Sequence, residues 1–236
     1  MAQRVRAVIE PAVLTTFQQE LLAWYAAEGR DLPWRRTSDP YAILVSEIML
    51  QQTQVRTVVP YYERFLARFP TLAALAAAPL AEVKAITDPL GYKARGERLK
   101  RIAETAMERY GGTLPRSEEE LLALPGIGRY TAGAIRSFAF REDAPILDTN
   151  VLRLLVRVFA PPRAGGGAAL LRRLWALAEA VIPPGQGHVF NQALMDFGAQ
   201  VCTARKPICL FCPLRPICAR WSSTGPTVRY APVPPA

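Results

Sequence analysis

The sequence predicts an all-α protein, and three of its features carry that prediction. Apolar residues recur at helical spacing along most of the chain. No segment alternates apolar and polar residues over a length that would give a strand of useful size. Glycine and proline clusters interrupt the periodic stretches and leave short connections between them. With 236 residues, 50% of them hydrophobic, the chain can bury one good core or two modest ones.

The charge of the chain favours a polyanionic partner. There are 29 Lys and Arg residues against 20 Asp and Glu residues, so the formal net charge is +9. No apolar run reaches the length of a membrane span, and the N-terminus lacks the apolar core of a signal peptide. We therefore expect a soluble, cytoplasmic, monomeric protein without a membrane partner.

The first half of the chain predicts a series of short helices. Residues 13–27 form an amphipathic stretch, which Asp31–Arg36 (DLPWRR) ends as an exposed basic turn. Ser117 and Glu120 have the spacing of a capping box at the start of a helix that ends at Leu124. The other helices of this half are expected at 40–59, 60–69, 72–86 and 97–110.

Glu47 stands out within the helix expected at 40–59. It falls on an apolar face, whose other members are Ile43, Leu44 and Leu50. A carboxylate there is costly unless it is paired or useful. Loss of water would raise its pKa, so Glu47 could hold a proton near neutral pH and act as an acid. A buried pair with an arginine, or a helix cap, explains an isolated glutamate equally well.

Two segments after this glutamate have side chains suited to nucleic acid. Gln51, Gln52 and Gln54 form a polar cluster that could hydrogen-bond bases or phosphates, although an ordinary solvated face has the same composition. The segment Leu90–Arg95 (LGYKAR) combines a glycine turn with an aromatic residue and two cations. An exposed Tyr92 in such a turn could wedge between bases.

The stretch LPGIGR, which starts at Leu124, predicts a tight hairpin. Gly126 and Gly128 surround a single apolar residue directly before a helix expected from Tyr130 to about Phe140. Both glycines can adopt positive φ and let another backbone approach. The first N–H groups of the helix, with the positive end of its dipole, then form a phosphate-binding geometry.

A second carboxylate, Asp148, closes the same stretch in the order ILDTN, immediately before another apolar helix. A helix N-terminus favours its anion. An N-cap aspartate is the structural alternative, and both roles are compatible.

The remaining chain predicts two more helices and a tail. A helix is expected at 170–182, and the segment 190–197 (FNQALMDF) leads into the cysteines. His188 is the single histidine, so imidazole pairs and multi-histidine metal sites are excluded. Residues 223–236 are rich in proline and are expected to be disordered.

The four cysteines of the chain are clustered near its end, at Cys202, Cys209, Cys212 and Cys218. In an intracellular protein this clustering favours a metal site over disulfides. Four-thiolate zinc sites usually contain two close pairs, and this chain has one. Thiolates at the spacing C-x6-C-x2-C-x5-C can surround a [4Fe-4S] cube. Spacing alone therefore favours iron–sulfur over zinc only slightly.

Four segments now occur in a fixed order: SEIMLQQTQV, LGYKAR, LPGIGRYTAGAI with ILDTNV, and the cysteine loop. Together they resemble the helix-hairpin-helix base-excision glycosylases of the endonuclease III superfamily, and most closely the MutY-type adenine DNA glycosylases. The resemblance covers roughly Leu32 to Ile217. It implies double-stranded DNA with a mispaired or damaged base as the partner.

The resemblance also implies a helix-hairpin-helix DNA glycosylase fold with two domains and a [4Fe-4S] cofactor. The expected parts are a six-helix domain at 29–140, with its hairpin at about 118–140, and a cluster domain made of 1–28 and 141–222 around the loop 202–218.

Catalytic roles follow from the same resemblance. Glu47 matches the acid that protonates the adenine leaving group, and Asp148 matches the carboxylate that faces the cationic sugar. Tyr130 and Asn150 match residues that hydrogen-bond in this site. Bifunctional members have a lysine directly after the hairpin, where this chain has Tyr130. The resemblance therefore implies hydrolysis without strong lyase activity.

Further positions match residues that contact DNA. Gln192 resembles the glutamine that reads adenine, and Tyr92 resembles the aromatic residue inserted beside the damaged guanine, after the target base leaves the stack. The expected contacts also include Gln51, Gln52, Gln54, Gly126, Gly128, Arg129, Arg205 and Lys206.

Departures from the MutY pattern leave two alternatives. We expect the C-terminal domain that recognises 8-oxoguanine to be absent, and Thr149 replaces a usual glycine. A thymine or uracil glycosylase acting on G mismatches is therefore a rival, although Gln192 and Val55 resemble the adenine enzymes. A non-catalytic DNA-damage sensor with a redox-active cluster is the other, but it would not need both Glu47 and Asp148.

Overall fold

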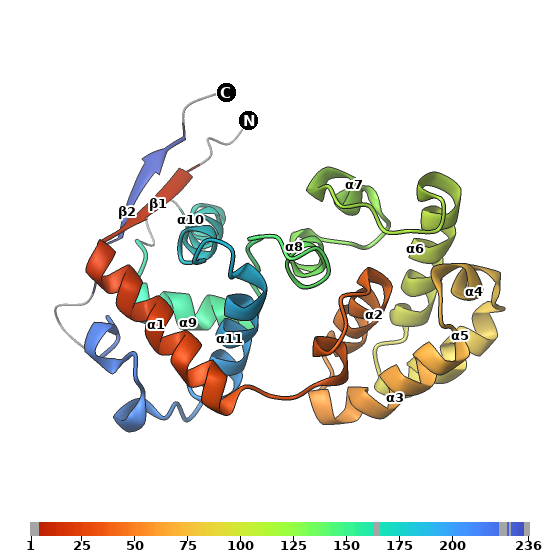
Figure 1. Cartoon of the computed structure of the whole chain (residues 1–236), viewed down its shortest axis with the longest axis horizontal. Coiled ribbons are helices and arrows are strands. Elements are labelled where there is room, and N and C mark those ends of the chain that lie inside the picture. Colours follow the sequence, from red (N-terminus) through yellow and green to blue (C-terminus); the bar gives the residue numbers. More distant parts are fainter. Residues whose placement is uncertain (1–4, 163–165, 222–225, 227, 234–236) are drawn as a thin grey trace. The chain divides into compact units, whose positions relative to one another are not determined.

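The computed structural model describes residues 5–162, 166–221, 226 and 228–233. The chain divides into two compact units: unit 1 combines Met1–Arg30 with Glu142–Ala236, and unit 2 is Asp31–Arg141. Both are mainly helical, which confirms the predicted class (Figure 1). No helix in these described ranges is long and apolar enough to cross a membrane.

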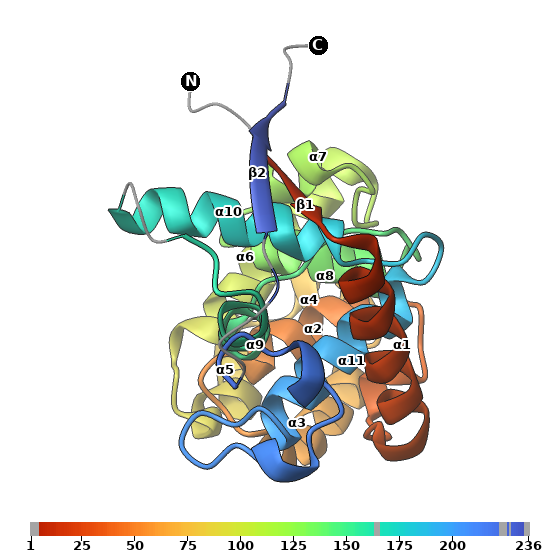
Figure 2. The same cartoon turned by 90° about the vertical axis from the view of Figure 1, so that its left-hand side faces the viewer.

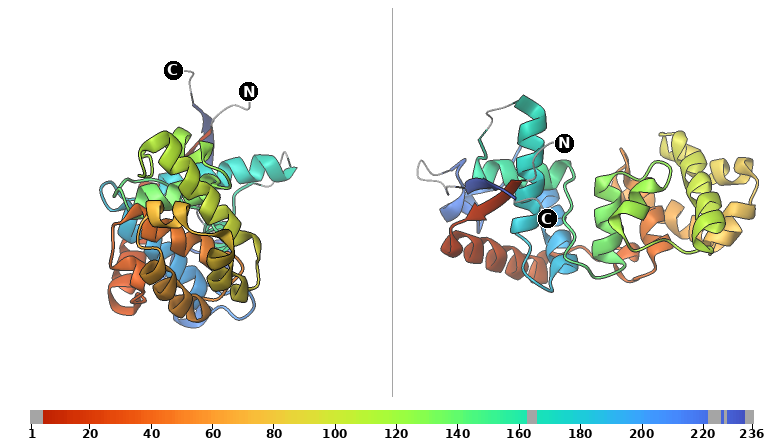
Figure 3. Two further views of the ribbon diagram at one scale, coloured as in Figure 1. Left: turned by 90° about the vertical axis from the view of Figure 1, so that its right-hand side faces the viewer. Right: turned by 90° about the horizontal axis from the view of Figure 1, so that it is seen from above.

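Unit 2 is built around a buried helix, α2 (Pro40–Leu50). Asp39 caps its start by accepting a hydrogen bond of 3.0 Å from the Tyr41 N–H, and every residue from Tyr41 to Met49 is buried. Figure 3 draws the helices of this unit in two further views. The other elements are η1 (Pro33–Arg35), α3 (Val55–Arg68), α4 (Leu72–Ala77), α5 (Leu80–Thr87), η2 (Asp88–Leu90), α6 (Ala94–Tyr110), α7 (Glu118–Ala123) and α8 (Arg129–Phe138).

Two predicted helices are each divided in the structure. The helix expected at 40–59 stops after Leu50 and restarts at Val55, with Gln52 at a left-handed φ of 59°. The intervening polar residues offer little apolar surface to bury, and a buried arginine side chain bonds the carbonyls of this turn. The helix expected at 72–86 is broken at Pro79, which has no N–H for a helical hydrogen bond.

Unit 1 has an aromatic core where helices from both chain ends meet. Its helical elements are α1 (Pro11–Glu28), α9 (Thr149–Phe159), α10 (Gly166–Ala180), α11 (Gly187–Gln200), η3 (Cys209–Phe211) and η4 (Arg215–Ile217). Phe17 of α1 lies edge-on to Phe159 of α9 and Phe190 of α11, with ring centroids 4.9 and 6.0 Å apart. This contact holds the N-terminal helix against the C-terminal ones.

A two-stranded antiparallel sheet corrects the expectation of a disordered tail. β1 (Val5–Ile9) pairs with β2 (Val228–Pro232), and β1 packs against α10 (Figure 2). The predicted disorder of 223–236 is thus wrong for 228–232, while 223–225, 227 and 234–236 lie outside the described residues. Each strand has only five residues and its partner is at the other end of the chain, so no local sequence pattern predicted the sheet.

Candidate functional site

The glycine hairpin connects α7 to α8 in unit 2. Gly126 has a φ of +81°, and an added Cβ would come within 2.8–2.9 Å of the Arg98 side chain. Gly128 has a φ of −100°, so it does not use the positive φ that a glycine can adopt. Among the described residues other than Gly128 and its two chain neighbours, no atom lies within 4 Å of a Cβ placed on Gly128. The exposed Arg129 and the half-buried Tyr130 follow as the first residues of α8.

Glu47 lies in the apolar interior of unit 2. It is 4% exposed, and the α2 residues Ile43, Leu44 and Ile48 around it in sequence are 0–1% exposed. The apolar face predicted from the sequence is therefore observed.

Arg98 brings together two segments predicted to contact DNA. Its Nη1 donates to Gln51 Oε1 over 2.7 Å, and its Nη2 donates to the Tyr92 hydroxyl over 3.1 Å. Its aliphatic part packs on Gly126 of the hairpin. The sequence did not identify Arg98, because an arginine on an amphipathic helix has the appearance of a solvated residue. The other members of the glutamine cluster, Gln52 and Gln54, are exposed.

Asp148 is the N-cap of α9 in unit 1. One carboxylate oxygen accepts from the Val151 N–H over 2.7 Å, and the other accepts from Asn150 Nδ2 over 2.8 Å. The predicted cap is confirmed. Burial raises the pKa of the Asp148 carboxyl above its ordinary value, although these hydrogen bonds and the charge of Arg153 act in the opposite direction.

Hydrogen bonds connect Asp148 to the cysteine loop through Asn150 and Arg153. Asn150 Oδ1 accepts from Arg153 Nη2 over 2.8 Å, and Arg153 Nε donates to the Cys202 carbonyl over 2.8 Å. Gly198 lets the backbone of α11 lie close to Asn150, because a Cβ on residue 198 would lie 2.8 Å from Cβ of Asn150. Neither Arg153 nor Gly198 was identified from the sequence.

Gln192 lies on α11 in unit 1 and is held by the N-terminal helix. Its Oε1 accepts from the Tyr25 hydroxyl over 2.6 Å. One turn later the fully buried Asp196 accepts from Arg30, both from the backbone N–H at 2.9 Å and from Nε at 2.8 Å. These contacts fix the orientation of the segment that contains Gln192.

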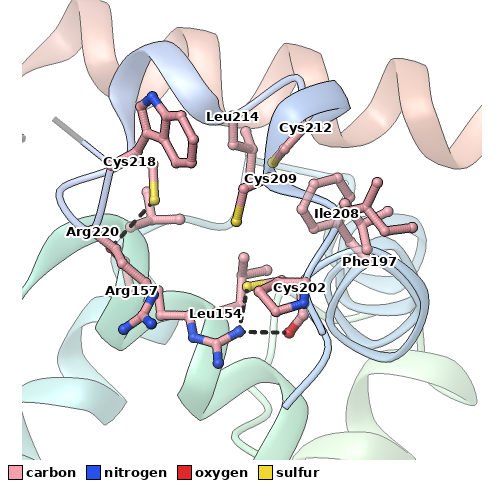
Figure 4. A pocket seen from close by; sticks show the side chains of 14 residues that line it. Leu154, Arg157, Phe197, Cys202, Ile208, Cys209, Cys212, Leu214, Cys218 and Arg220 are labelled. Atoms are coloured by element: carbon pink, nitrogen blue, oxygen red, sulfur yellow. Dashed lines mark hydrogen bonds between the residues drawn. The ribbon is translucent and has the colours of Figure 1, made fainter. Parts of the chain in front are cut away.

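The four cysteines line a single cavity of about 380 Å³ in unit 1 (Figure 4). Arg157 lies at its edge and donates from Nη1 to Cys202 Sγ over 3.4 Å and to the Thr203 carbonyl over 2.7 Å. All four cysteines are free of disulfides. The apolar part of the lining includes Leu154, Val158, Phe197 and Leu214.

The chemistry of this cavity fits a multi-iron cluster. A [4Fe-4S] cube takes one thiolate for each of its four irons, and four cysteines line this cavity. Burial raises the pKa of Cys212 to about 11 and also raises that of Cys218, so a cationic centre is needed to keep them ionised.

Basic residues cover the outside of the cysteine loop. Arg205 and Lys206 are exposed between the first two cysteines. Arg215 is exposed as well, and its guanidinium carbon lies 4.3 Å from the centroid of the Trp221 ring. The loop therefore presents several cations on one segment that contains no acidic residue.

Known proteins match most of this chain. The adenine DNA glycosylase of Rattus norvegicus is 44% identical over 223 residues, which cover 91% of this chain and 43% of that protein. The thymine-DNA glycosylase of Aeropyrum pernix is 38% identical over 214 residues, which cover 89% of this chain and 96% of that protein. The chain spans about two fifths of the length of the mammalian relatives it matches.

A solved structure and a family model also match this chain. The solved structure of a thermostable thymine-DNA glycosylase has a TM-score of 0.83 at 33% identity, covering 89% of this chain and 97% of that one. The family model described as "HhH-GPD superfamily base excision DNA repair protein" matches residues 45–179, a segment that contains both Glu47 and Asp148 as well as the hairpin. Because that segment is more than half of the sequence, the chain belongs to the HhH-GPD superfamily of base excision DNA repair proteins.

Proposed function

We propose that this chain is a monofunctional DNA glycosylase that removes adenine mispaired with 8-oxoguanine or guanine. The observation that carries the proposal is the presence of two carboxylates. Glu47 is buried on α2, and Asp148 is held by hydrogen bonds at a helix N-terminus. Base excision needs one proton donor for the base and one anion for the sugar. The 44% identity to an adenine DNA glycosylase supports adenine as the base.

In this mechanism Glu47 begins protonated and transfers its proton to the adenine ring. The electrons of the breaking glycosidic bond remain with the base, which leaves as a neutral molecule. Asp148 must be ionised, because it stabilises the positive charge that develops on the sugar. Water then adds to the sugar carbon and loses a proton, and the product is an abasic site. Val151 and Asn150 orient the Asp148 carboxylate through their hydrogen bonds.

Tyr130 supports a reaction that ends with hydrolysis. A lysine at this position could attack the sugar and form a Schiff base, and elimination would then cut the strand. A phenol has no amine to form that intermediate. We therefore propose little or no lyase activity for this chain, with borohydride trapping of a covalent DNA adduct as the decisive assay.

The proposed partner is double-stranded DNA, bound by a monomer in the cytoplasm. In unit 2, the open space beside Gly128 and the exposed Arg129 support phosphate contact at the hairpin. Tyr92 and the glutamine cluster are proposed to contact bases beside the mispair. In unit 1, Gln192 is proposed to read the extruded adenine.

The four cysteines are proposed to hold a [4Fe-4S] cluster. When bound, this group would fix the loop that presents Arg205 and Lys206 to phosphate. The cavity volume and the low-dielectric lining support a cluster over a single ion. A colourless protein that contains zinc and no iron would contradict this assignment.

A thymine or uracil glycosylase acting on G mismatches is the second candidate. It is favoured by one specific observation, the match over 96% of the thymine-DNA glycosylase of Aeropyrum pernix. In both candidate functions Asp148 would stabilise the cationic sugar. The two functions differ in the base that Gln192 would contact.

The test is single-turnover excision on a duplex panel, followed by alkali to reveal abasic sites. The panel contains A opposite 8-oxoguanine, A opposite G, T opposite G, U opposite G and hypoxanthine pairs. Excision of adenine, fastest opposite 8-oxoguanine or G, supports the proposal. Excision of pyrimidines alone supports the second candidate. Binding without any excision would identify a non-catalytic damage sensor instead.

A further inference from the structure

Arg98 contacts two of the proposed base-probing residues of unit 2, Gln51 and Tyr92. Its guanidinium donates to Gln51 Oε1 and to the Tyr92 hydroxyl, and its carbon lies 5.6 Å from the centroid of the Tyr92 ring. These two residues belong to different turns, one after α2 and one before α6. A single side chain therefore joins both turns.

The hairpin contributes the surface on which Arg98 lies. A Cβ on residue 126 would be 2.8 Å from Cδ of Arg98 and 2.9 Å from its Cγ. Gly126 thus serves two purposes, because it permits a φ of +81° and it leaves room for the arginine stem. Three segments proposed to contact DNA meet at this one side chain.

Arg95 makes the backbone under this arrangement rigid. It is 0% exposed, and its Nε donates to the Ile48 carbonyl over 3.1 Å. Nη1 donates to the Leu90 carbonyl over 3.2 Å, and Nη2 donates to the Thr53 hydroxyl over 2.6 Å. Nη2 also donates to the Gln51 carbonyl, so Arg95 bonds backbone oxygens at the ends of α2 and of η2. The backbones of the two turns cannot move apart without leaving these buried groups unsatisfied.

We propose that Arg98 is a positioning residue for mispair recognition, which holds Tyr92 and Gln51 in their probing orientation before DNA arrives. The inference rests on the proposed function. Preordering these side chains removes the entropy that binding would otherwise spend on fixing them. Its Nη1 and Nη2 atoms bond neutral protein groups, so its role is distinct from that of a phosphate-binding arginine.

Salt dependence separates a positioning arginine from a phosphate contact. Each neutralised phosphate adds about 0.9 to the slope of log affinity against log salt. A positioning residue leaves that slope unchanged and instead alters the preference for a mispair over a matched duplex. The experiment measures both quantities for Arg98→Met, which removes the charge and keeps a stem, and for Arg98→Lys, which keeps the charge and loses the planar fork.

Arg101→Met is the matched control, because Arg101 is an exposed arginine on the same helix and the formal charge changes equally. We expect both Arg98 variants to lose about tenfold in the ratio of mispair to matched affinity, which is the effect of about one hydrogen bond to a charged group. We expect the control to retain the wild-type ratio. The salt slope of Arg98→Met should equal that of the control.

Tyr92→Phe keeps the ring and removes the hydroxyl that Arg98 contacts, so it tests the same bond from the other side. We expect a smaller loss of preference, and we expect Arg98→Lys to have less effect in the Tyr92→Phe background than in the wild type, because contacting residues are not additive. These two variants keep the test valid if Arg98→Met fails to fold.

Two results would overturn the inference. The first is a salt slope that falls by about one unit in Arg98→Met and not in Arg101→Met, which would make Arg98 a phosphate contact. The second is an unchanged mispair preference in folded Arg98→Lys. In both cases the wild type still prefers and excises its mispair, whereas a wild type without that preference would contradict the proposed function itself.

Discussion

The two carboxylates proposed to act in catalysis, Glu47 and Asp148, have different structural surroundings. Glu47 belongs to α2, in which every residue from Tyr41 to Met49 is buried in unit 2. Asp148 is fixed by polar contacts with Asn150 and Val151, and this network extends through Arg153 to the cysteine loop of unit 1. Glu47 should therefore be insensitive to the state of the proposed cluster. Asp148 should depend on that state.

The largest effect is expected from replacing the proposed acid. Glu47→Gln keeps the size of the side chain and removes the proton that must reach the base. General acid catalysis contributes about 10²–10⁴-fold, so single-turnover excision should slow by that amount. Affinity for the mispaired duplex should stay within about threefold, because a neutral glutamine replaces a protonated glutamate.

An excision rate for Glu47→Gln close to that of the wild type would remove Glu47 from the mechanism. Ser46→Ala is the control, since Ser46 is an equally buried neighbour whose hydroxyl donates to the Ile43 carbonyl within its own helix. We expect this variant to retain most of the excision rate.

The next effect tests whether the proposed iron–sulfur cluster stabilises unit 1 and not unit 2. Cys212→Ser should lower iron content and expose the amides of α9 and α11 to faster hydrogen exchange, because the loop is anchored on α9 by the Ala219 and Arg220 N–H groups. The amides of α2 and α8 should keep their protection. Exchange followed by mass spectrometry checks both expectations, and equal loosening of the two units would refute the separation.

A smaller effect is expected from cutting the network between the two sites of unit 1. Arg153→Met removes the bonds to Asn150 and to the Cys202 carbonyl and keeps much of the stem. By analogy with residues that orient catalytic or metal-binding groups, we expect a loss of about 10–100-fold in excision. Iron content should be nearly unchanged. If iron and activity fall in parallel, Arg153 supports the loop and not the carboxylate.

Local patterns predicted the parts of these sites that depend on local structure. An apolar stripe was enough to predict the burial of Glu47, and a capping residue before an apolar helix was enough for Asp148. Arg98, Arg153 and the contact of Tyr25 with Gln192 could not be predicted, because each joins residues that are brought together only by the fold.

The hairpin also has one feature that the local sequence predicted and another that depends on the rest of the fold. The GIG pattern predicted a tight turn, yet only Gly126 adopts positive φ, and the reason for a glycine there includes a side chain from another helix. The conformation of Gly128 is extended, which any residue can adopt. Sequence spacing therefore located the turn but did not assign a task to each glycine.

The smallest expected effect concerns the pH dependence of stability at Asp148. Burial raises the pKa of this carboxyl in the folded protein, so the folded state binds the proton more tightly than the unfolded state. Its contribution to stability is then complete below the unfolded pKa and is lost as the pH rises through the folded pKa. Asp148→Asn cannot ionise and keeps an oxygen that can cap the Val151 N–H.

The melting temperature of Asp148→Asn relative to the wild type should therefore be highest at neutral pH. The difference should shrink as the pH falls through the folded pKa, down to the ordinary range of aspartate near 4. Thermal unfolding of both proteins across this range checks the sign, since all other titrating groups are common to the pair. A difference that grows on acidification would mean that the helix N-terminus and the hydrogen bonds outweigh burial. The folded protein would then favour the ionised form of Asp148. In that case Asp148 would already be in the form that stabilises a cationic sugar, without losing a proton first.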